Sequence, residues 1–458
     1  MPLTGGDESA QSAISPEMMM RKNIGMFLII LTTYAFAAST AHAWSSHCNL
    51  TRVIFQKDAS LDRRLRAETL GSFLELERDG IRNLLQNEEE WFVKNIPGYP
   101  PVPAALRFVG TGPARDLTAA FSRAIRINPG FACPLYLQTP SGSVKIAKRV
   151  MPVGRVSLVT ADIAQPPLFA LSAGDTATAR EVLETASEEP DFGMDVGLFA
   201  DNKTTFGAEY GFGTQPFGNP ELDYGTQAPF HMAFFHENFI IKLAAPFSKI
   251  SHVEYRIRLY TALASFAFKT GHDYWGYRFA GWALHYIQDM AVPYHARMTP
   301  GIGTLRLIWA NLFYSEEKRN GLLNILSNRH LVFEKYQYYA LIDLMGRKAH
   351  DNLLLSALAG TSADANAGSY TDRYAREVVS RASYDIADDI DDLMGDSFPL
   401  KYVSDPAYLF GVTEPEIDVY AFLKRENPAA AQKMDNAMAP IFKRLGTASR
   451  LYIKSLAD

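Results

Sequence analysis

The sequence predicts a mainly helical, all-α protein, and two features of its 458 residues support that prediction. Apolar residues recur at three-to-four spacing along most of the chain, above all after Ser251, and this is the period of an amphipathic helix. β-Branched residues dominate only between Ser143 and Thr160. The composition, with 47% hydrophobic and 21% charged residues, is that of a globular protein and excludes collagen-like, coiled-coil and wholly disordered chains.

The first half of the chain is expected to hold short, mixed elements. Leucines and isoleucines at helical spacing predict an amphipathic helix over 60–95, which ends at the four prolines and one glycine of 96–103. A short helix is predicted over 115–127 and a strand pair over 143–160. Asp175 is expected to be the N-cap of a helix that runs through Ala186.

The second half is expected to be almost entirely helical after a stretch of loops. Glycine and aromatic residues dominate 192–235 and predict long loops there. Helices are expected over 251–269, 273–290, 303–345, 371–394 and 428–455. Breaks are expected at Gly271, Pro293, Gly346, the Pro399 region and Pro428, because glycine and proline interrupt or end helices.

The amino-terminal segment has the pattern of a secretory signal. Arg21 and Lys22 precede an apolar run over 24–36, and the small residues before Trp44 provide a cleavage site after Ala43. The run is shorter than the roughly 20 residues that span a bilayer as a helix. We therefore expect a signal peptide over 1–43 and one mature domain over 44–458, exported to the periplasm or secreted, with an uncleaved anchor as the alternative.

The net charge and the number of cysteines bear on nucleic-acid binding and on disulfide formation. A net charge of −5 argues against broad electrostatic binding of duplex nucleic acid. Cys48 and Cys133 are too few for a disulfide scaffold, although they could form one bridge in an oxidising compartment.

Histidines and carboxylates at helical spacing predict a metal site. His285 and Asp289 are four apart on a predicted helix and share a face, and His295 follows Pro293 on a turn. His330 and Glu334 repeat the spacing further on. Imidazole and carboxylate together suit zinc, whereas either pair alone is more often a helix-stabilising contact.

The predicted cleavage adds two further donors. Cutting after Ala43 would leave Trp44 with a free α-amino group, which can bind a metal together with its own carbonyl oxygen. His47 follows three residues later.

These motifs resemble those of the zinc-dependent phospholipase C and S1/P1 nuclease superfamily, exported helical enzymes with three zinc ions and a metal-binding amino-terminal tryptophan. The family's H-x-x-x-D-x(5)-H core matches His285, Asp289 and His295, and its later H-x-x-x-E/D pair matches His330 and Glu334. The resemblance implies the family's fold. It also implies that Asp289 bridges two zinc ions. The implied ligands of the first ion are Trp44 and His47, those of the second are Asp191, His231 and His285, and those of the third are His295, His330 and Glu334.

Two of these assignments have neighbouring alternatives. Asp191 matches a small-residue-then-aspartate segment of the family and His231 a histidine before an aromatic-rich turn, but Asp195 and His236 could replace them. Asp191 is also the candidate general base, so it and Asp289 are the expected catalytic residues.

The resemblance covers 44–55 and 180–458 and leaves an atypical, partly β insertion at about 56–179, which could be a lid, a membrane-contacting element or a partner surface. The expected activity is phospholipase C cleavage of phospholipids at a membrane surface to diacylglycerol and a phosphorylated head group. Glu334 as the last ligand and the acidic charge favour it over a single-strand nuclease or nucleotidase, and a non-enzymatic helical protein with structural zinc is the third possibility. The aromatic residues Phe230, Phe234, Phe235, Trp275 and Trp282 could form a lipid-facing or base-stacking wall, or simply pack in the core.

Overall fold

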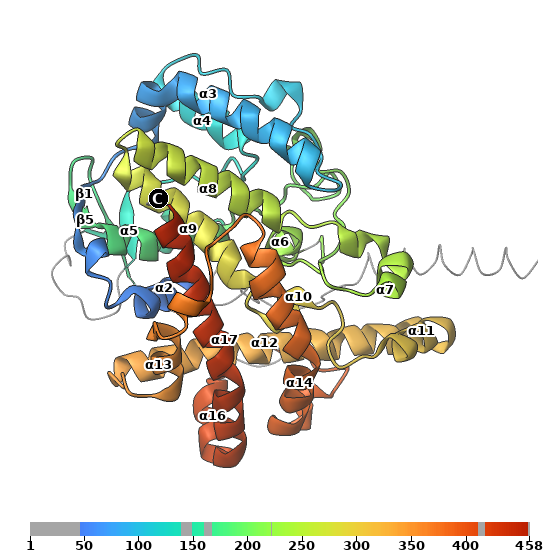
Figure 1. Cartoon of the computed structure of the whole chain (residues 1–458). Coiled ribbons are helices and arrows are strands. Elements are labelled where there is room, and N and C mark those ends of the chain that lie inside the picture. The colour runs from blue at the N-terminus through green and yellow to red at the C-terminus, as the bar shows by residue number, and fades with distance from the viewer. Residues whose placement is uncertain (1–45, 139–148, 160–166, 221, 411–416, 457–458) are drawn as a thin grey trace, which may run out of the picture.

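The computed structural model describes residues 46–138, 149–159, 167–220, 222–410 and 417–456 (Figure 1). Helices make up 63% and strands 4% of the described residues, which confirms the all-α class. The predicted signal peptide and Trp44 lie outside the described residues. Among the helices that are described, none combines the length and the apolar character that crossing a membrane requires.

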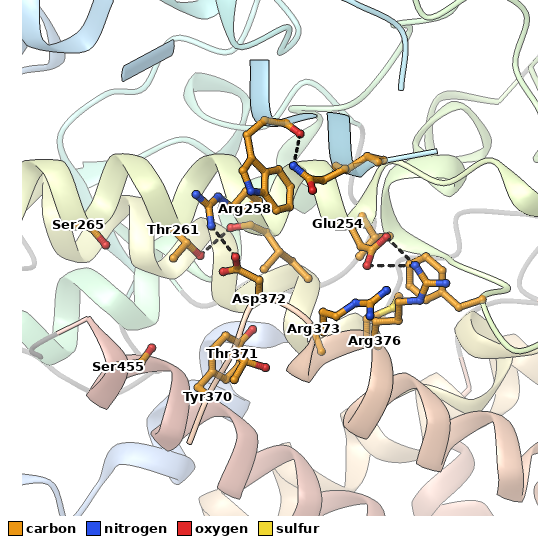
Figure 2. Close-up of a pocket in the computed structure, with 18 of the residues that line it drawn as sticks. Glu254, Arg258, Thr261, Ser265, Tyr370, Thr371, Asp372, Arg373, Arg376 and Ser455 are labelled. Atoms are coloured by element: carbon orange, nitrogen blue, oxygen red, sulfur yellow. Dashed lines mark hydrogen bonds and ion pairs between the residues drawn. The ribbon is translucent and has the colours of Figure 1, made fainter. Parts of the chain in front are cut away.

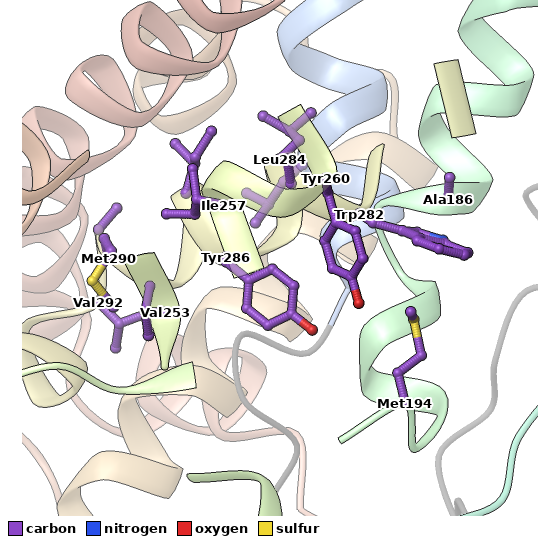
Figure 3. Packing of buried hydrophobic residues seen from close by; sticks show 14 of the residues in the cluster. Ala186, Met194, Val253, Ile257, Tyr260, Trp282, Leu284, Tyr286, Met290 and Val292 are labelled. Atoms are coloured by element: carbon purple, nitrogen blue, oxygen red, sulfur yellow. The ribbon is translucent and has the colours of Figure 1, made fainter. Parts of the chain in front are cut away.

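The centre of the fold is α9 (Asp273–Asp289), which is buried along nearly its whole length. It packs against α8 (Val253–Lys269), α5 (Ala179–Ala186) and α17 (Pro428–Ser455). Gly281 allows α5 to come close, because a Cβ there would lie 2.5 Å from the Cβ of Ala186. Aromatic residues of α8 and α9, among them Tyr260, Trp282 and Tyr286, fill this core (Figure 3).

The other helices surround this centre and carry the rest of the core. On the side opposite α3 in Figure 1 lie α10 (Pro293–Ala296), α12 (Glu316–Gly346), α13 (Leu353–Ala359), α14 (Arg381–Ser397) and α16 (Val419–Glu426). The short α15 (Leu400–Val403) packs against α12 and α14. α2 (His47–Phe55) packs against α5, α13 and α17. The two short helices α7 (Phe239–Ala244) and α11 (Thr304–Phe313) lie at the right of the view.

The insertion predicted at about 56–179 contains all the strands of the described residues. β1 (Arg64–Arg66) pairs antiparallel with β5 (Thr176–Thr178), so the two ends of the insertion meet. β2 (Tyr136–Gln138), β4 (Leu168–Ala170) and β3 (Val150–Met151) form a second antiparallel sheet in that spatial order. Its helices α3 (Leu70–Asn95) and α4 (Ala114–Ala124) pack together, and α3 lies on α8.

The insertion belongs to the same hydrophobic core as the rest of the chain. The ring of Phe73 on α3 lies 6.1 Å from that of Trp275 and 6.0 Å from that of Phe279, both on α9. Phe121 on α4 lies 6.2 Å from Phe279. Residues 56–179 therefore share one hydrophobic core with the central helices.

Two helices begin later than predicted, and a third predicted helix is interrupted. The helix expected from residue 60 begins at Leu70, because 64–66 are taken by β1 and Thr69 caps α3 by accepting from the Ser72 N–H. The cap of α5 is Thr178 in a capping box with Glu181, whereas Asp175 accepts from the Ser172 N–H. The helix expected over 303–345 is two helices, since Ser315 caps α12 anew.

Other differences are smaller. The region 192–235 is not all loop, because α6 (Asp223–His231) lies within it. Of the strand pair expected over 143–160, 143–148 and 160 lie outside the described residues, and Val150–Met151 pairs with β4 instead. The helix expected from 371 begins as a π-helical turn, η9 (Ala375–Ser380), before α14. The helices over 115–127, 251–269, 273–290 and 428–455 are confirmed to within three residues at each end.

Candidate metal centre

Eight of the nine predicted metal ligands converge in one place, and the ninth, Trp44, lies outside the described residues. They come from α2, the 3-10 turn η5 (Glu189–Phe192), α6, α9, α10 and α12. Their donor atoms form three groups, each within 4.8 Å: His47 with His285 and Asp289, Asp191 with His231 and His285, and His295 with His330 and Glu334. The second and third groups have the membership that the resemblance implied, and the first also includes His285.

Asp289 is the fully buried carboxylate that connects the groups. Its Oδ2 lies 2.9 Å from His231 Nδ1 and 3.4 Å from His285 Nε2. Its Oδ1 lies 3.7 Å from His47 Nε2 and 3.4 Å from His295 Nδ1. The two oxygens therefore face different sets of imidazoles, as a carboxylate bridging two ions would.

Backbone and amide oxygens orient two of the histidines. His285 Nδ1–H donates to the Ser187 carbonyl oxygen at 2.8 Å, which leaves Nε2 facing the centre. His47 Nδ1–H donates to Gln288 Oε1 at 2.8 Å, so that its Nε2 also faces the centre. Gln288 is itself fixed, because its Nε2 donates to Thr51 Oγ1 at 3.0 Å.

The structure separates His231 from His236 and Asp191 from Asp195. His231 lies in the centre, whereas His236 contacts the Arg376 carbonyl oxygen outside it. Asp195 lies 3.5 Å from His231 Nε2, on the outer side of that ring. The Arg256 guanidinium at 2.5 Å and the Tyr286 hydroxyl at 2.6 Å hold Asp195 there, so it orients the histidine.

Asp191 lies on η5 at the more open side of the centre. Its Oδ1 is 3.6 Å from His285 Nε2, and its Oδ2 is 3.8 Å from His47 Nε2. The preceding Glu189 is buried and bonds the Arg278 guanidinium at 2.6 Å, which ties η5 to α9. The side chains of Asp191 and His330 are 10% and 13% exposed, whereas the other six donors are 0–3% exposed, so these two are the most accessible donors of the centre.

The third group joins α10 to α12. His295 Nε2 lies 3.2 Å from Glu334 Oε1, and His330 Nε2 lies 2.9 Å from the same oxygen. His295 was expected on a turn after Pro293, and it lies on α10, a single helical turn that begins at Pro293. Because His295 Nδ1 also faces Asp289, this imidazole links the third group to the other two.

The chain enters the centre at the start of α2 under two constraints. Ser46, directly before His47, has a φ of 98°, a left-handed conformation that is uncommon for a residue with a side chain. The buried carboxylate of Glu188 accepts the Cys48 N–H at 2.8 Å. Burial raises the pKa of Glu188 to about 7. These contacts fix the first turn of α2, which carries His47, next to the centre.

For three donors of the centre, neighbouring charged groups outweigh the effect of burial on the pKa. Burial lowers the pKa of His231, but the Asp289 charge and the bonds to Asp195 and Asp289 outweigh burial and raise it to about 10. Burial likewise lowers the pKa of His295, but Asp289 and Glu334 raise it to about 9. Burial raises the pKa of Glu334, but His330 and His295 hold it at about 2.

For His47 and Asp191, burial has the largest effect on the pKa and sets the direction of its shift. Burial lowers the pKa of His47 to about 4, so this imidazole is neutral at neutral pH. Burial, with a further contribution from Asp289, raises the pKa of Asp191 well above its ordinary value. The centre thus concentrates groups whose protonation a bound cation would change.

The donor geometry fits divalent metal ions. Two donors on one tetrahedral zinc ion lie about 3.3 Å apart, given bond lengths near 2.0 Å. The donor atoms of each group here lie within 4.8 Å of one another, and His330 Nε2 and Glu334 Oε1 are 2.9 Å apart. His47 Nε2 and Asp191 Oδ2 are buried, and neither has a hydrogen-bond partner within the described part of the chain. Such atoms are costly unless something binds them, and a cation between them would.

Gln288 was not predicted to have a role, and a substitution tests whether it positions His47. In Gln288→Leu the imidazole loses its acceptor, so we expect the affinity for added divalent metal to fall by about 10- to 100-fold. Gln288→Glu keeps an acceptor oxygen and should bind the metal within a few-fold of the unmodified protein. Competition with a chromophoric chelator measures both affinities, and equal losses in the two variants would contradict the positioning role.

The aromatic residues predicted to form a wall and the two cysteines lie outside this centre, and most of them are buried. Phe230, Phe234, Trp275 and Trp282 are at most 4% exposed and pack in the core, so they form no lipid-facing or base-stacking wall, and Phe235 is partly buried against the core. Cys48 and Cys133 are free and buried, and burial raises the pKa of the Cys133 thiol to about 12. The bridge that these cysteines could have formed is therefore not present.

A separate pocket of about 480 Å³ lies where α3, α8 and the start of η9 meet (Figure 2). Four of its five charged residues form ion pairs: the Arg258 guanidinium lies 2.7 Å from Asp372, and Arg376 lies 3.2 Å from Glu254. None of its lining residues is a histidine or cysteine. The pocket therefore lacks the imidazole donors of the metal centre.

Comparisons of the chain with protein-family models, with curated proteins and with solved structures gave no match. The functional argument consequently depends on the residues and their geometry.

Proposed function

We propose that the protein is an exported zinc-dependent phosphodiester hydrolase with three metal ions, and that its substrate is a phospholipid, cleaved to diacylglycerol and a phosphorylated head group. The observation that carries the proposal is the convergence of five imidazoles and three carboxylates in three groups around Asp289. No cysteine is among these donors, and nitrogen and oxygen donors without sulfur suit zinc in a hydrolytic site.

The charge of such a centre favours an anionic substrate. Bound zinc ions would activate water near neutral pH and offset the charge that develops on the phosphoryl oxygens. The eight donors include only three carboxylates, Asp191, Asp289 and Glu334, so three divalent ions would leave the centre with net positive charge. A phosphodiester carries the complementary negative charge.

In this proposal the chain's own residues orient the metal-binding histidines and accept the proton of the attacking water. Asp191 is one of the two most accessible donors of the centre, and its carboxylate is the candidate base for the attacking water. Asp195 lies beside His231 Nε2, and Gln288 accepts from His47 Nδ1–H. In both imidazoles this is the nitrogen that faces away from the centre, so the two contacts hold the rings in place. The burial of the other donors excludes bulk water from the reacting groups.

The substrate class can be tested directly. The purified protein is incubated with phosphatidylcholine vesicles and, separately, with single-stranded DNA and a nucleoside monophosphate. We expect release of diacylglycerol and phosphocholine, and loss of that release when a chelator is present. Faster cleavage of DNA or of the monophosphate would reassign the centre to nuclease or nucleotidase chemistry, and bound zinc without any hydrolysis would indicate a structural role.

A further inference from the structure

Two short helices expose an unusual amount of apolar surface. Of the 18 large hydrophobic side chains that are exposed in the described residues, eight belong to α7 and α11. On α11 they are Leu305, Ile308, Trp309, Leu312 and Phe313, and on α7 they are Phe239, Ile240 and Leu243. Exposed apolar patches of this kind mark surfaces that contact a partner or a membrane.

The apolar residues of α11 all lie on one face. Their spacing of three, four, seven and eight from Leu305 is that of a single helical stripe, and this stripe points away from the protein. The opposite side of the helix contains the buried Ala310. The rings of Trp309 and Phe313 lie 4.2 Å apart, and Trp309 is 58% exposed. α11 thus has the orientation of an amphipathic helix whose apolar face is left uncovered by the described part of the chain.

α7 and α11 are held beside each other on a packed base. The Asn238 side chain, which caps α7, donates to Thr304 Oγ1 at the start of α11, at 2.9 Å. Beneath α7 a small hydrophobic cluster, which includes Ala245 and Phe247, packs against Met298 from the segment before α11. Both helices lie at the right edge of Figure 1, beyond the main body.

Both helices adjoin elements that carry metal-centre residues. α7 follows α6, which ends at His231, and α11 lies between α10 with His295 and α12 with His330. A surface that binds α7 and α11 is therefore connected to three donors of the centre through short stretches of chain.

The charge of these segments is the opposite of that of the whole chain. Residues 238–250 and 303–315 contain Lys242, Lys249 and Arg306 but no aspartate or glutamate, although the chain as a whole has a net charge of −5. Arg306 flanks the apolar stripe of α11, where its guanidinium can reach lipid phosphates while its aliphatic part remains in the apolar layer. Aromatic and aliphatic residues bordered by cations are typical of helices that lie in a membrane interface.

We infer that α7 and α11 form a membrane-docking face, which inserts into the interface of a phospholipid bilayer and brings the metal centre to its substrate. Docking deepens the proposed function, because a lipid substrate must be drawn from a surface. It is nevertheless measurable without catalysis.

The test uses the protein purified after export, with its amino terminus sequenced, and vesicles of phosphatidylcholine and phosphatidylglycerol. The variant pairs are Trp309→Ser with Phe313→Ser on α11 and Phe239→Ser with Leu243→Ser on α7. The matched control is Leu76→Ser with Leu400→Ser, which removes side chains that are 71% and 72% exposed elsewhere on the surface. Vesicle flotation measures binding, and a water-soluble phosphodiester measures the centre separately.

We expect the α11 pair to weaken vesicle binding by about tenfold for each aromatic residue removed, with the control pair unchanged. Hydrolysis of the soluble phosphodiester should stay the same in all variants. Equal vesicle binding by all four proteins, or no binding by the unmodified one, would overturn docking. A dimer in light scattering that the α11 pair dissociates would assign the face to a second copy. Failure to hydrolyse the soluble substrate would instead refute the proposed function.

Discussion

Replacing Asp289 by asparagine is expected to remove more than one zinc ion and to lower phosphodiester hydrolysis by at least about 10³-fold. The amide keeps the size of the side chain but loses its charge and one acceptor oxygen. Because the two carboxylate oxygens face different imidazoles, one substitution disturbs more than one group of donors. Elemental analysis of the purified variant and steady-state kinetics measure the two effects.

The matched control for this variant is Asp435→Asn on α17. Asp435 is also buried and accepts the Tyr336 hydroxyl, but it belongs to none of the three donor groups. It should lose some stability and keep its zinc. If Asp289→Asn retained full zinc and full activity, the bridging role would be wrong.

Removing metal with a chelator should abolish hydrolysis while leaving the helical content nearly unchanged at room temperature. The reason is that histidines and carboxylates of the centre compensate one another without metal, as the raised pKa of His231 and the lowered pKa of Glu334 indicate. Metal that binds only the folded protein adds about 4 kcal/mol per site at a thousandfold excess over its Kd. The melting temperature should therefore fall by several degrees for each ion removed.

Circular dichroism, thermal melts and activity before and after dialysis check this expectation, and added zinc should restore all three. Loss of helicity together with activity would mean that the metal maintains the fold. Undiminished hydrolysis after complete metal removal would contradict a metal-dependent reaction.

The sequence was most informative where donors share one helix. His285 with Asp289, and His330 with Glu334, were predictable because a spacing of four puts two side chains on one face. Asp191 and His231 come from a 3-10 turn and a short helix with no such period, so they were assigned only by resemblance, with neighbours as alternatives. Gln288 gave no local signal of its role, because its partner His47 lies 241 positions away.

In the fold as well, the sequence predicted elements that depend on neighbouring residues better than elements that depend on contacts between distant segments. Long helices such as α8, α9 and α17 were predicted closely because their apolar residues repeat regularly. The start of α3 was wrong because the preceding residues pair with β5, a contact between segments more than a hundred residues apart. Such pairings override local preference and are not visible in a window of neighbouring residues.

The spread of the donors from α2 to α12 has a consequence for how the protein matures. A nascent chain cannot offer a complete set of ligands until α12 has been synthesised and has packed against α10. A polypeptide that crosses a membrane unfolded would have to acquire its ions afterwards. The zinc supply of the receiving compartment, rather than that of the cytoplasm, would then set the fraction of active molecules.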